Sequence, residues 1–119
     1  MESTRASGTD IRYTGLREPV PAVNPAAGLA AYRAVQEALS NALRHAPGAA
    51  VDVEVALERP HRLRVEVINE APPRPPKESA PGAGLGLSGI RERIGAVGGT
   101  VDLSPTPEGG FAMRATLPL

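Results

Sequence analysis

The chain has 119 residues, of which 41% are apolar, and this is enough for one domain with one core. Thirteen basic residues balance thirteen acidic ones, so no net positive field is available to attract nucleic acid. The lack of cysteine excludes disulfides, thiolate zinc sites and a cysteine nucleophile. Because no long apolar run and no secretion signal are found, we expect a soluble cytoplasmic domain.

The N-terminal part of the chain divides into two predicted segments. We expect residues 1–8 to be disordered and residues 9–119 to form the single domain. Ile11 and Tyr13 alternate with polar residues, which predicts a short strand over residues 9–15. Three prolines between residues 19 and 25 then interrupt regular structure.

A long helix is predicted from residue 26 to about residue 46, with Asn24 as its N-cap and Pro25 at its first position. Its apolar stripe is expected to consist of Leu29, Tyr32, Val35, Leu39, Ala42, Leu43 and Ala46. A second face carries Glu37, Asn41, Arg44 and His45 at spacings of three and four residues, which aligns these side chains.

This second face has two interpretations. Asparagine has a poor helix propensity, and the rest of the helix is rich in alanine and leucine. That contrast indicates a functional reason for Asn41. The alternative is an ordinary solvated face with a Glu–Asn pair four residues apart.

Two alternating segments follow, at residues 51–57 and 63–69, and they predict a hairpin with one buried and one solvated face. Residues 70–82 contain five prolines together with charged residues. This irregular segment is a candidate lid because it leads directly to a glycine-rich loop. The alternative is a plain connector.

The glycine-rich loop spans residues 82–89 and opens into a helix predicted to begin at a Ser88 cap, with apolar residues at 90, 94 and 97. Gly98-Gly99 is expected to end this helix. A glycine loop at a helix N-terminus is a potential anion site, because free N–H groups and the helix dipole both favour negative charge. A flexible turn before a surface helix is the alternative.

The chain ends with two predicted strands, at residues 100–104 and 111–117, joined by a turn. The full order is strand, helix, two strands, loop, helix, two strands. We therefore expect a two-layer α/β sandwich, in which helices cover one face of a mixed, mainly antiparallel sheet.

Two motifs carry a resemblance to a known family. Residues 32–46, YRAVQEALSNALRHA, resemble the N box of sensor histidine kinases, and Gly82–Leu87 with residues 89–93 resembles their second glycine box. Over residues 10–119 the chain is similar to the ATP-binding catalytic domain of kinases that signal to NarL-type response regulators. The wider group includes gyrase, the heat-shock chaperone and MutL ATPases. The resemblance implies the Bergerat ATP-binding fold, with ATP and Mg²⁺ as ligands.

The resemblance also implies roles for individual residues. Asn41 would coordinate Mg²⁺, Glu37 would orient or activate groups near the metal, and Arg44 and His45 would lie close to the phosphates. The second glycine box would wrap the phosphate chain beneath the lid, which assigns nucleotide binding to Gly82, Gly84, Leu85, Gly86 and Leu87.

One motif departs from the family pattern. The first glycine box usually has Asp-x-Gly after the second hairpin strand, and its carboxylate accepts a hydrogen bond from the adenine amino group. Here the residues are Asn69-Glu70-Ala71. Asn69 can still accept through its amide oxygen but has no charge, and Ala71 restricts the backbone beneath the base. We assign both to the nucleotide site.

The function implied is transfer of the γ-phosphoryl group of Mg-ATP to a histidine on a dimerising helical domain, and from there to an aspartate of a response regulator. Nothing before residue 26 is predicted to form that helical domain, so we expect a monomeric catalytic domain with little activity alone. Its parent kinase could be membrane-anchored. A regulatory or degenerate module without phosphotransfer, similar to anti-sigma factors or a pseudokinase, is the alternative. A small α/β domain without any ligand is the third.

Overall fold

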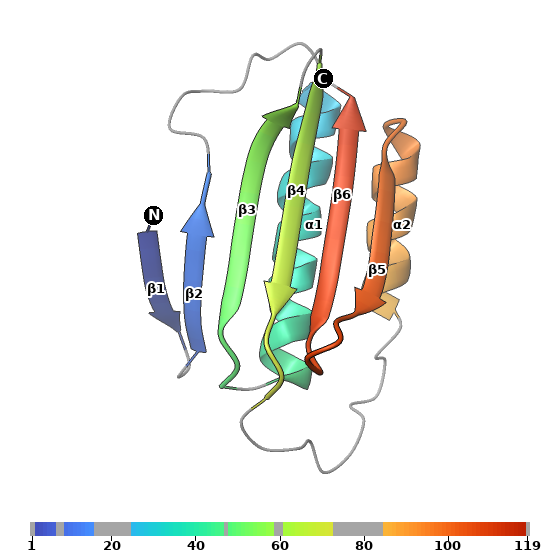
Figure 1. Ribbon diagram of the computed structural model, residues 1–119. Helices are drawn as coiled ribbons and strands as arrows, with labels where there is room; N and C mark the ends of the chain where they lie inside the picture. Colours follow the sequence, from blue (N-terminus) through green and yellow to red (C-terminus); the bar gives the residue numbers. More distant parts are fainter. Residues whose placement is uncertain are drawn as a thin grey trace.

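A computed structural model describes residues 2–6, 9–15, 25–46, 48–58, 61–72 and 85–118. The strands in these residues are β1 (Glu2–Ala6), β2 (Thr9–Thr14), β3 (Val51–Glu58), β4 (Arg62–Asn69), β5 (Thr100–Pro105) and β6 (Phe111–Pro118). The helices are α1 (Pro25–His45) and α2 (Leu85–Ala96). The strands form one sheet in the order β1-β2-β3-β4-β6-β5, and both helices lie on the same face of it (Figure 1).

The sheet is mixed. Strands β2 and β3 pair in parallel, with Ile11 beside Val51, and the other neighbouring strands pair antiparallel. Together with the two helices on one face, this confirms the predicted two-layer sandwich. The pairing also brings Asn69 at the end of β4 next to Phe111 at the start of β6.

Strand β1 corrects the expectation of disorder for residues 2–6, whereas residues 1, 7 and 8 lie outside the described part of the chain. All of β1 pairs antiparallel with β2, from Glu2 beside Tyr13 to Ala6 beside Thr9. The segment has no alternation of apolar residues to signal a strand. Main-chain hydrogen bonds along an open sheet edge do not depend on such a pattern, which is why the sequence did not reveal it.

The core lies between the sheet and the helices. Its largest fully buried side chains come from both layers: Ile90, Ile94, Met113, Leu117, Val51 and Val65. Helix α1 contributes mainly small residues to this core: Ala27, Ala30, Ala31, Ala34, Ala38 and Ala42.

The buried face of α1 is therefore rotated from the predicted apolar stripe, of which Ala42 and Ala46 are buried as expected. Leu29 is 54% exposed and Tyr32 is 62% exposed, whereas Ala34 is fully buried. Val35 and Leu39 are only partly buried against the core. A row of alanines allows the helix backbone to approach the sheet closely, and close packing rather than side-chain size decides which face is buried.

Helix α2 begins earlier than predicted and ends as predicted. It starts at Leu85, so Ser88 lies inside the helix instead of capping it. The full burial of Ile90 and Ile94 stabilises the helix despite the glycines in its first half. At its end Gly98 has φ 81°, and the N–H of Gly99 donates to the carbonyl of Ile94 at 2.9 Å. This is a Schellman-type ending, for which glycine is favoured.

The other face of the sheet is polar and open, as the hairpin pattern predicted. Arg64 of β4 lies 2.9 Å from carboxylate oxygens of Glu54, Glu58 and Glu66. The hydrogen bond to Glu66, with the charges of the surrounding carboxylates, raises the pKa of Arg64 above its ordinary value. Its guanidinium therefore stays charged and balances part of the negative charge of this face.

Candidate functional site

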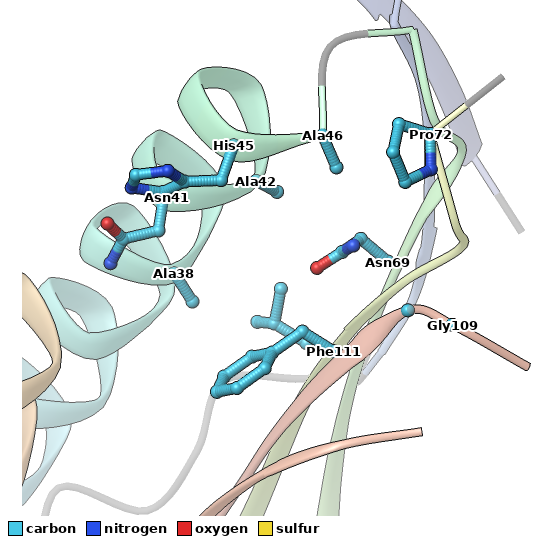
Figure 2. A pocket seen from close by; sticks show the side chains of 11 residues that line it. Ala38, Asn41, Ala42, His45, Ala46, Asn69, Pro72, Gly109 and Phe111 are labelled. Atoms are coloured by element: carbon cyan, nitrogen blue, oxygen red, sulfur yellow. The ribbon is translucent and has the colours of Figure 1, made fainter. Parts of the chain in front are cut away.

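A cavity opens where the second half of α1 faces the end of β4 and the start of β6 (Figure 2). Its volume is about 370 Å³. The residues that line it are Ala38, Asn41, Ala42, His45, Ala46, Val67, Asn69, Pro72, Gly109, Gly110 and Phe111. An apolar cavity with a few polar groups is typical of a small-molecule site.

The helix wall of the cavity combines small and polar residues. Ala38, Ala42 and Ala46 follow each other at four-residue spacing and leave the space between helix and sheet open. Asn41 and His45, one turn apart, stand beside this row (Figure 2). The nitrogens Nδ2 of Asn41 and Nε2 of His45 are buried and find no hydrogen-bond partner among the described residues. Buried polar atoms favour hydrogen-bonded partners, so these two nitrogens can take part in hydrogen bonds with a molecule bound at this wall.

The sheet wall presents an acceptor. Nδ2 of Asn69 donates to the backbone carbonyl of Glu70 at 3.0 Å, which leaves the side-chain oxygen free for another bond. Figure 2 shows this oxygen directed into the cavity between α1 and Phe111. The N–H of Glu70 in turn donates to the carbonyl of Ala50 at 2.9 Å, which fixes the chain just beyond β4.

The turn between β5 and β6 forms the third wall. Gly109 has φ 90°, and a Cβ added at Gly110 would overlap the backbone oxygen of Asn69. The N–H of Gly110 donates to Oγ1 of Thr106 at 2.9 Å. Only glycine allows this turn to lie so close to the end of β4.

Several of these residues were not predicted from the sequence. The turn residues Gly109 and Gly110, together with Phe111 and Pro72, line the cavity. The adjacent glycines before the chain's single phenylalanine were the available signal. Conversely, Ala71 does not line the cavity: it is exposed, and its Cβ lies 3.3 Å from where a Cβ of Gly109 would be.

The aligned polar face of α1 divides between two hollows. Asn41 and His45 face the apolar cavity, whereas Glu37 and Arg44 line a second, polar hollow of about 300 Å³ together with Arg33, Gln36, Ser40 and Arg93. Nη1 of Arg93 donates to Oε1 of Glu37 at 2.9 Å and so ties α2 to α1. Arg44 donates to Oγ of Ser40 at 3.3 Å.

Part of the predicted site lies outside the described residues. This holds for Gly82, Gly84 and most of the predicted lid. Leu85, Gly86 and Leu87 form the first turn of α2, where the structure describes the backbone alone. Within the described part, no cluster of three or more His, Cys, Asp or Glu side chains is placed to hold a metal ion. Neither described helix combines the length and apolar character needed to cross a membrane.

The sequence of the chain is similar to characterised proteins. Residues 27–119 match the family of histidine kinase-, DNA gyrase B-, and HSP90-like ATPases. The signal transduction histidine-protein kinase/phosphatase UhpB of Salmonella typhimurium is 33% identical over 87 residues, which are 73% of this chain and 16% of that protein. The chain thus spans a small part of this relative.

The fold is similar to solved structures. The mycobacterial sensor histidine kinase MprB matches with a TM-score of 0.68 at 21% identity, covering 94% of this chain and 84% of that one. The histidine kinase domain of a blue-light activated kinase from Erythrobacter litoralis gives a TM-score of 0.71 at 21% identity, covering 96% and 53%. These similarities confirm the predicted fold.

Proposed function

The chain belongs to the family of histidine kinase-, DNA gyrase B-, and HSP90-like ATPases and is an ATPase domain of the histidine kinase type, and we propose that it presents Mg-ATP for phosphoryl transfer. The γ-phosphoryl group would pass to a histidine on a separate helical domain and then to an aspartate of a response regulator. The observation that supports this proposal is the cavity between α1 and the ends of β4 and β6, with its directed acceptor and its unpaired nitrogens.

The adenine base is proposed to occupy the apolar part of the cavity. The alanine row and Phe111 provide flat, uncharged walls, and the oxygen of Asn69 can accept a hydrogen bond from the adenine amino group. Because Asn69 is neutral, this bond lacks the charge assistance that a carboxylate would supply, and charge-assisted bonds are about twice as strong.

The phosphates are proposed to pass Asn41 and His45. Nδ2 of Asn41 and Nε2 of His45 can donate hydrogen bonds to phosphate oxygens. These bonds would give both nitrogens a partner, which neither has among the described residues. The side-chain oxygen of Asn41 is the proposed protein ligand of Mg²⁺, an ion that takes few protein ligands, binds substrate phosphates and keeps several waters. When bound, Mg²⁺ would neutralise part of the charge on the phosphates.

The chain's own contribution to the reaction would then be positioning. Phosphoryl transfer needs in-line geometry and charge neutralisation rather than covalent help from the protein. Within the described residues the two histidines do not suit the acceptor role: His45 lines the cavity, and His61 lies exposed in the turn between β3 and β4. The acceptor histidine is therefore assigned to the separate domain.

Calorimetric titration of the chain with a non-hydrolysable ATP analogue and Mg²⁺ tests the proposal, repeated with Asn69→Asp. The new carboxylate should tighten binding several-fold, since about 1 kcal/mol of extra hydrogen-bond strength corresponds to a factor of about five. The control is Thr100→Asp, which adds the same charge at an exposed position beside Thr116, at the opposite end of β6 from Asn69. Absence of binding by the unmodified chain would contradict the nucleotide site, and equal effects of the two variants would contradict the adenine role.

A second candidate function is a nucleotide-binding regulatory module without phosphotransfer, and Asn69 in place of the usual aspartate favours it. Mixing the chain with a helical domain that carries the acceptor histidine separates the two functions. Labelled phosphate on that histidine would support the kinase proposal, whereas nucleotide binding without transfer would support the regulatory module.

A further inference from the structure

We propose that the outer side of α1 is a docking surface for an amphipathic helix of another protein, with acidic residues beside the apolar stripe of that helix. The surface consists of residues that recur alternately three and four positions apart along α1. We name it the α1 seam, and its members are Leu29, Tyr32, Gln36, Leu39 and Leu43. The first three are exposed, and the two leucines at its end are half-buried.

The α1 seam lies opposite the face of α1 that packs on the sheet. At about 100° per residue, its members fall within an arc of about 80°. The middle of this arc is about 180° from Ala34, which is fully buried. Asn41 and His45, which line the nucleotide cavity, fall within about 20° of Ala34 on the same scale. The α1 seam is therefore separate from the cavity, and its occupation does not require a nucleotide.

The spacing of the α1 seam favours a helix as the partner. Apolar residues that alternate at three and four positions form the narrow surface by which two helices pack in a coiled coil. A helix that packs only on its own domain has its larger apolar residues inside and polar residues outside. Helix α1 shows the reverse, with alanines against the sheet and Leu29 and Tyr32 outside. The α1 seam extends over about 21 Å, or about four turns, and fits a helix of similar length.

The middle of the α1 seam is polar. Nε2 of Gln36 donates to the hydroxyl of Tyr32 at 3.1 Å, so the two side chains lie along the helix and support each other. Tyrosine offers a large apolar surface with a polar end, which suits a partly wet interface. A single polar position within an otherwise apolar seam restricts the register of the partner helix.

Positive charge borders one side of the α1 seam. Arg33 and Arg44 are exposed and lie about 40–60° beyond Leu29 around the helix. Among the described residues, Arg44 donates to the neutral hydroxyl of Ser40 at 3.3 Å, and neither arginine has a carboxylate partner. The residues of α1 on the other border are uncharged. Charge complementarity therefore selects a partner with carboxylates along one side of its stripe.

A second copy of the chain does not provide these carboxylates. Glu37 is the only acidic residue of α1, and its Oε1 lies 2.9 Å from Nη1 of Arg93. Two copies packed through their α1 seams would leave the bordering arginines of both without a carboxylate from either helix. A helix of a different protein can supply both the apolar stripe and the negative charge.

Two synthetic peptides are the probes for this surface. Both are rich in alanine and carry leucines alternately three and four residues apart, and they differ only in having glutamate or lysine beside the leucines. Fluorescence anisotropy at low salt measures the affinity of the chain for each labelled peptide. The glutamate peptide should bind at least about fivefold more tightly than the lysine peptide. Failure of the glutamate peptide to bind, or equal affinities for the two peptides, would overturn the proposal.

Leu29→Ala tests whether the peptide lies on the α1 seam. It should weaken binding of the glutamate peptide by about tenfold, because the partner would cover a methyl group in place of a leucine. The matched control is Leu57→Ala, which removes a leucine that is 45% exposed on β3. Its affinity should not change. Equal losses in the two variants would mean that the peptide adheres to apolar surface in general, which contradicts the proposal.

Arg33→Glu tests the charge of the partner. The variant should reverse the preference, so that the lysine peptide binds more tightly than the glutamate peptide. Arg62→Glu is the control, since it makes the same change at an exposed position at the start of β4, and it should keep the original preference. An unchanged preference in Arg33→Glu would contradict an acidic partner.

Sedimentation of the chain alone separates a second copy from a different protein. A dimer that Leu29→Ala dissociates would mean that the α1 seam joins two copies, and this would overturn the proposal. The affinity for the ATP analogue should be the same in Leu29→Ala as in the unmodified chain, because the α1 seam faces away from the cavity. Failure of the unmodified chain to bind nucleotide would overturn the proposed function and leave the docking surface in place.

Discussion

The replacement Gly110→Ala tests the position of the turn between β5 and β6 against the end of β4. An added Cβ would overlap the backbone oxygen of Asn69 and lie 3.1 Å from Oγ1 of Thr106. The obstacle is backbone in a paired strand, which cannot rotate away as a flexible side chain can. The ends of β4 and β6 must therefore separate.

The expected loss of stability can be worked from three contributions. Overpacking a close contact costs about 1–3 kcal/mol. Weakening the bond from the N–H of Gly110 to Thr106, now 2.9 Å, costs about 1 kcal/mol more. The smaller conformational freedom of alanine in the unfolded chain returns about 0.4–1 kcal/mol. The net destabilisation is about 2 kcal/mol, a large fraction of the 5–15 kcal/mol typical of small domains.

Urea unfolding followed by circular dichroism measures this change, with Gly28→Ala as the control. Gly28 is exposed in α1, and a Cβ added there meets nothing within 4 Å. This control should raise the free energy of unfolding by about 0.5–1 kcal/mol, since alanine is the better helix former. The two variants should also differ in ligand binding. Only Gly110→Ala displaces Asn69, so only this variant should bind the ATP analogue more weakly.

The result that would refute this reasoning is a Gly110→Ala variant as stable as the unmodified chain. It would mean that the turn does not pack on the end of β4 as described. The turn would then not form the third wall of the cavity.

Two further predictions concern the core and the open sheet face. Ala34→Leu adds bulk at a fully buried position between helix and sheet and should lower the free energy of unfolding by about 1–3 kcal/mol. Leu29→Ala, at a position 54% exposed, should change it by less than about 0.5 kcal/mol. Equal effects of the two variants in thermal unfolding would contradict the rotated face of α1. Arg64→Ala leaves three carboxylates without their shared cation, so the variant should be destabilised at low salt and should recover part of the loss near 1 M salt, where the Debye length is about 3 Å. A urea midpoint difference that does not depend on salt would count against this.

The strands and helices of the domain could be predicted because their signals are local. Alternation marked β3, β4 and β6, and the pair Asn24-Pro25 marked the start of α1. Strand β1 was missed because main-chain pairing needs no apolar pattern. The buried face of α1 was misjudged because alanines and larger apolar residues occupy different faces of the helix, and periodicity alone favoured the larger ones.

The polar residues of the candidate site could be anticipated, and its walls could not. The sequence pointed to Asn41, His45 and Asn69, and the structure places all three on one cavity. Phe111 was not anticipated because its position beside Asn69 depends on the pairing of β4 with β6, which joins segments far apart in the chain. The division of the polar face of α1 also escaped prediction, because residues three and four positions apart are still offset around the helix.

The alanine row of α1 has a consequence for the mobility of the site. Alanine has no side-chain rotamers to lose on burial, so packing these alanines against the sheet costs almost no side-chain conformational entropy. A larger side chain has several rotamers at such a contact, whereas a methyl group has no alternative rotamer. Asn41 and His45 are therefore carried on a stiff support. A ligand that binds there meets groups already in place and loses little affinity to ordering them.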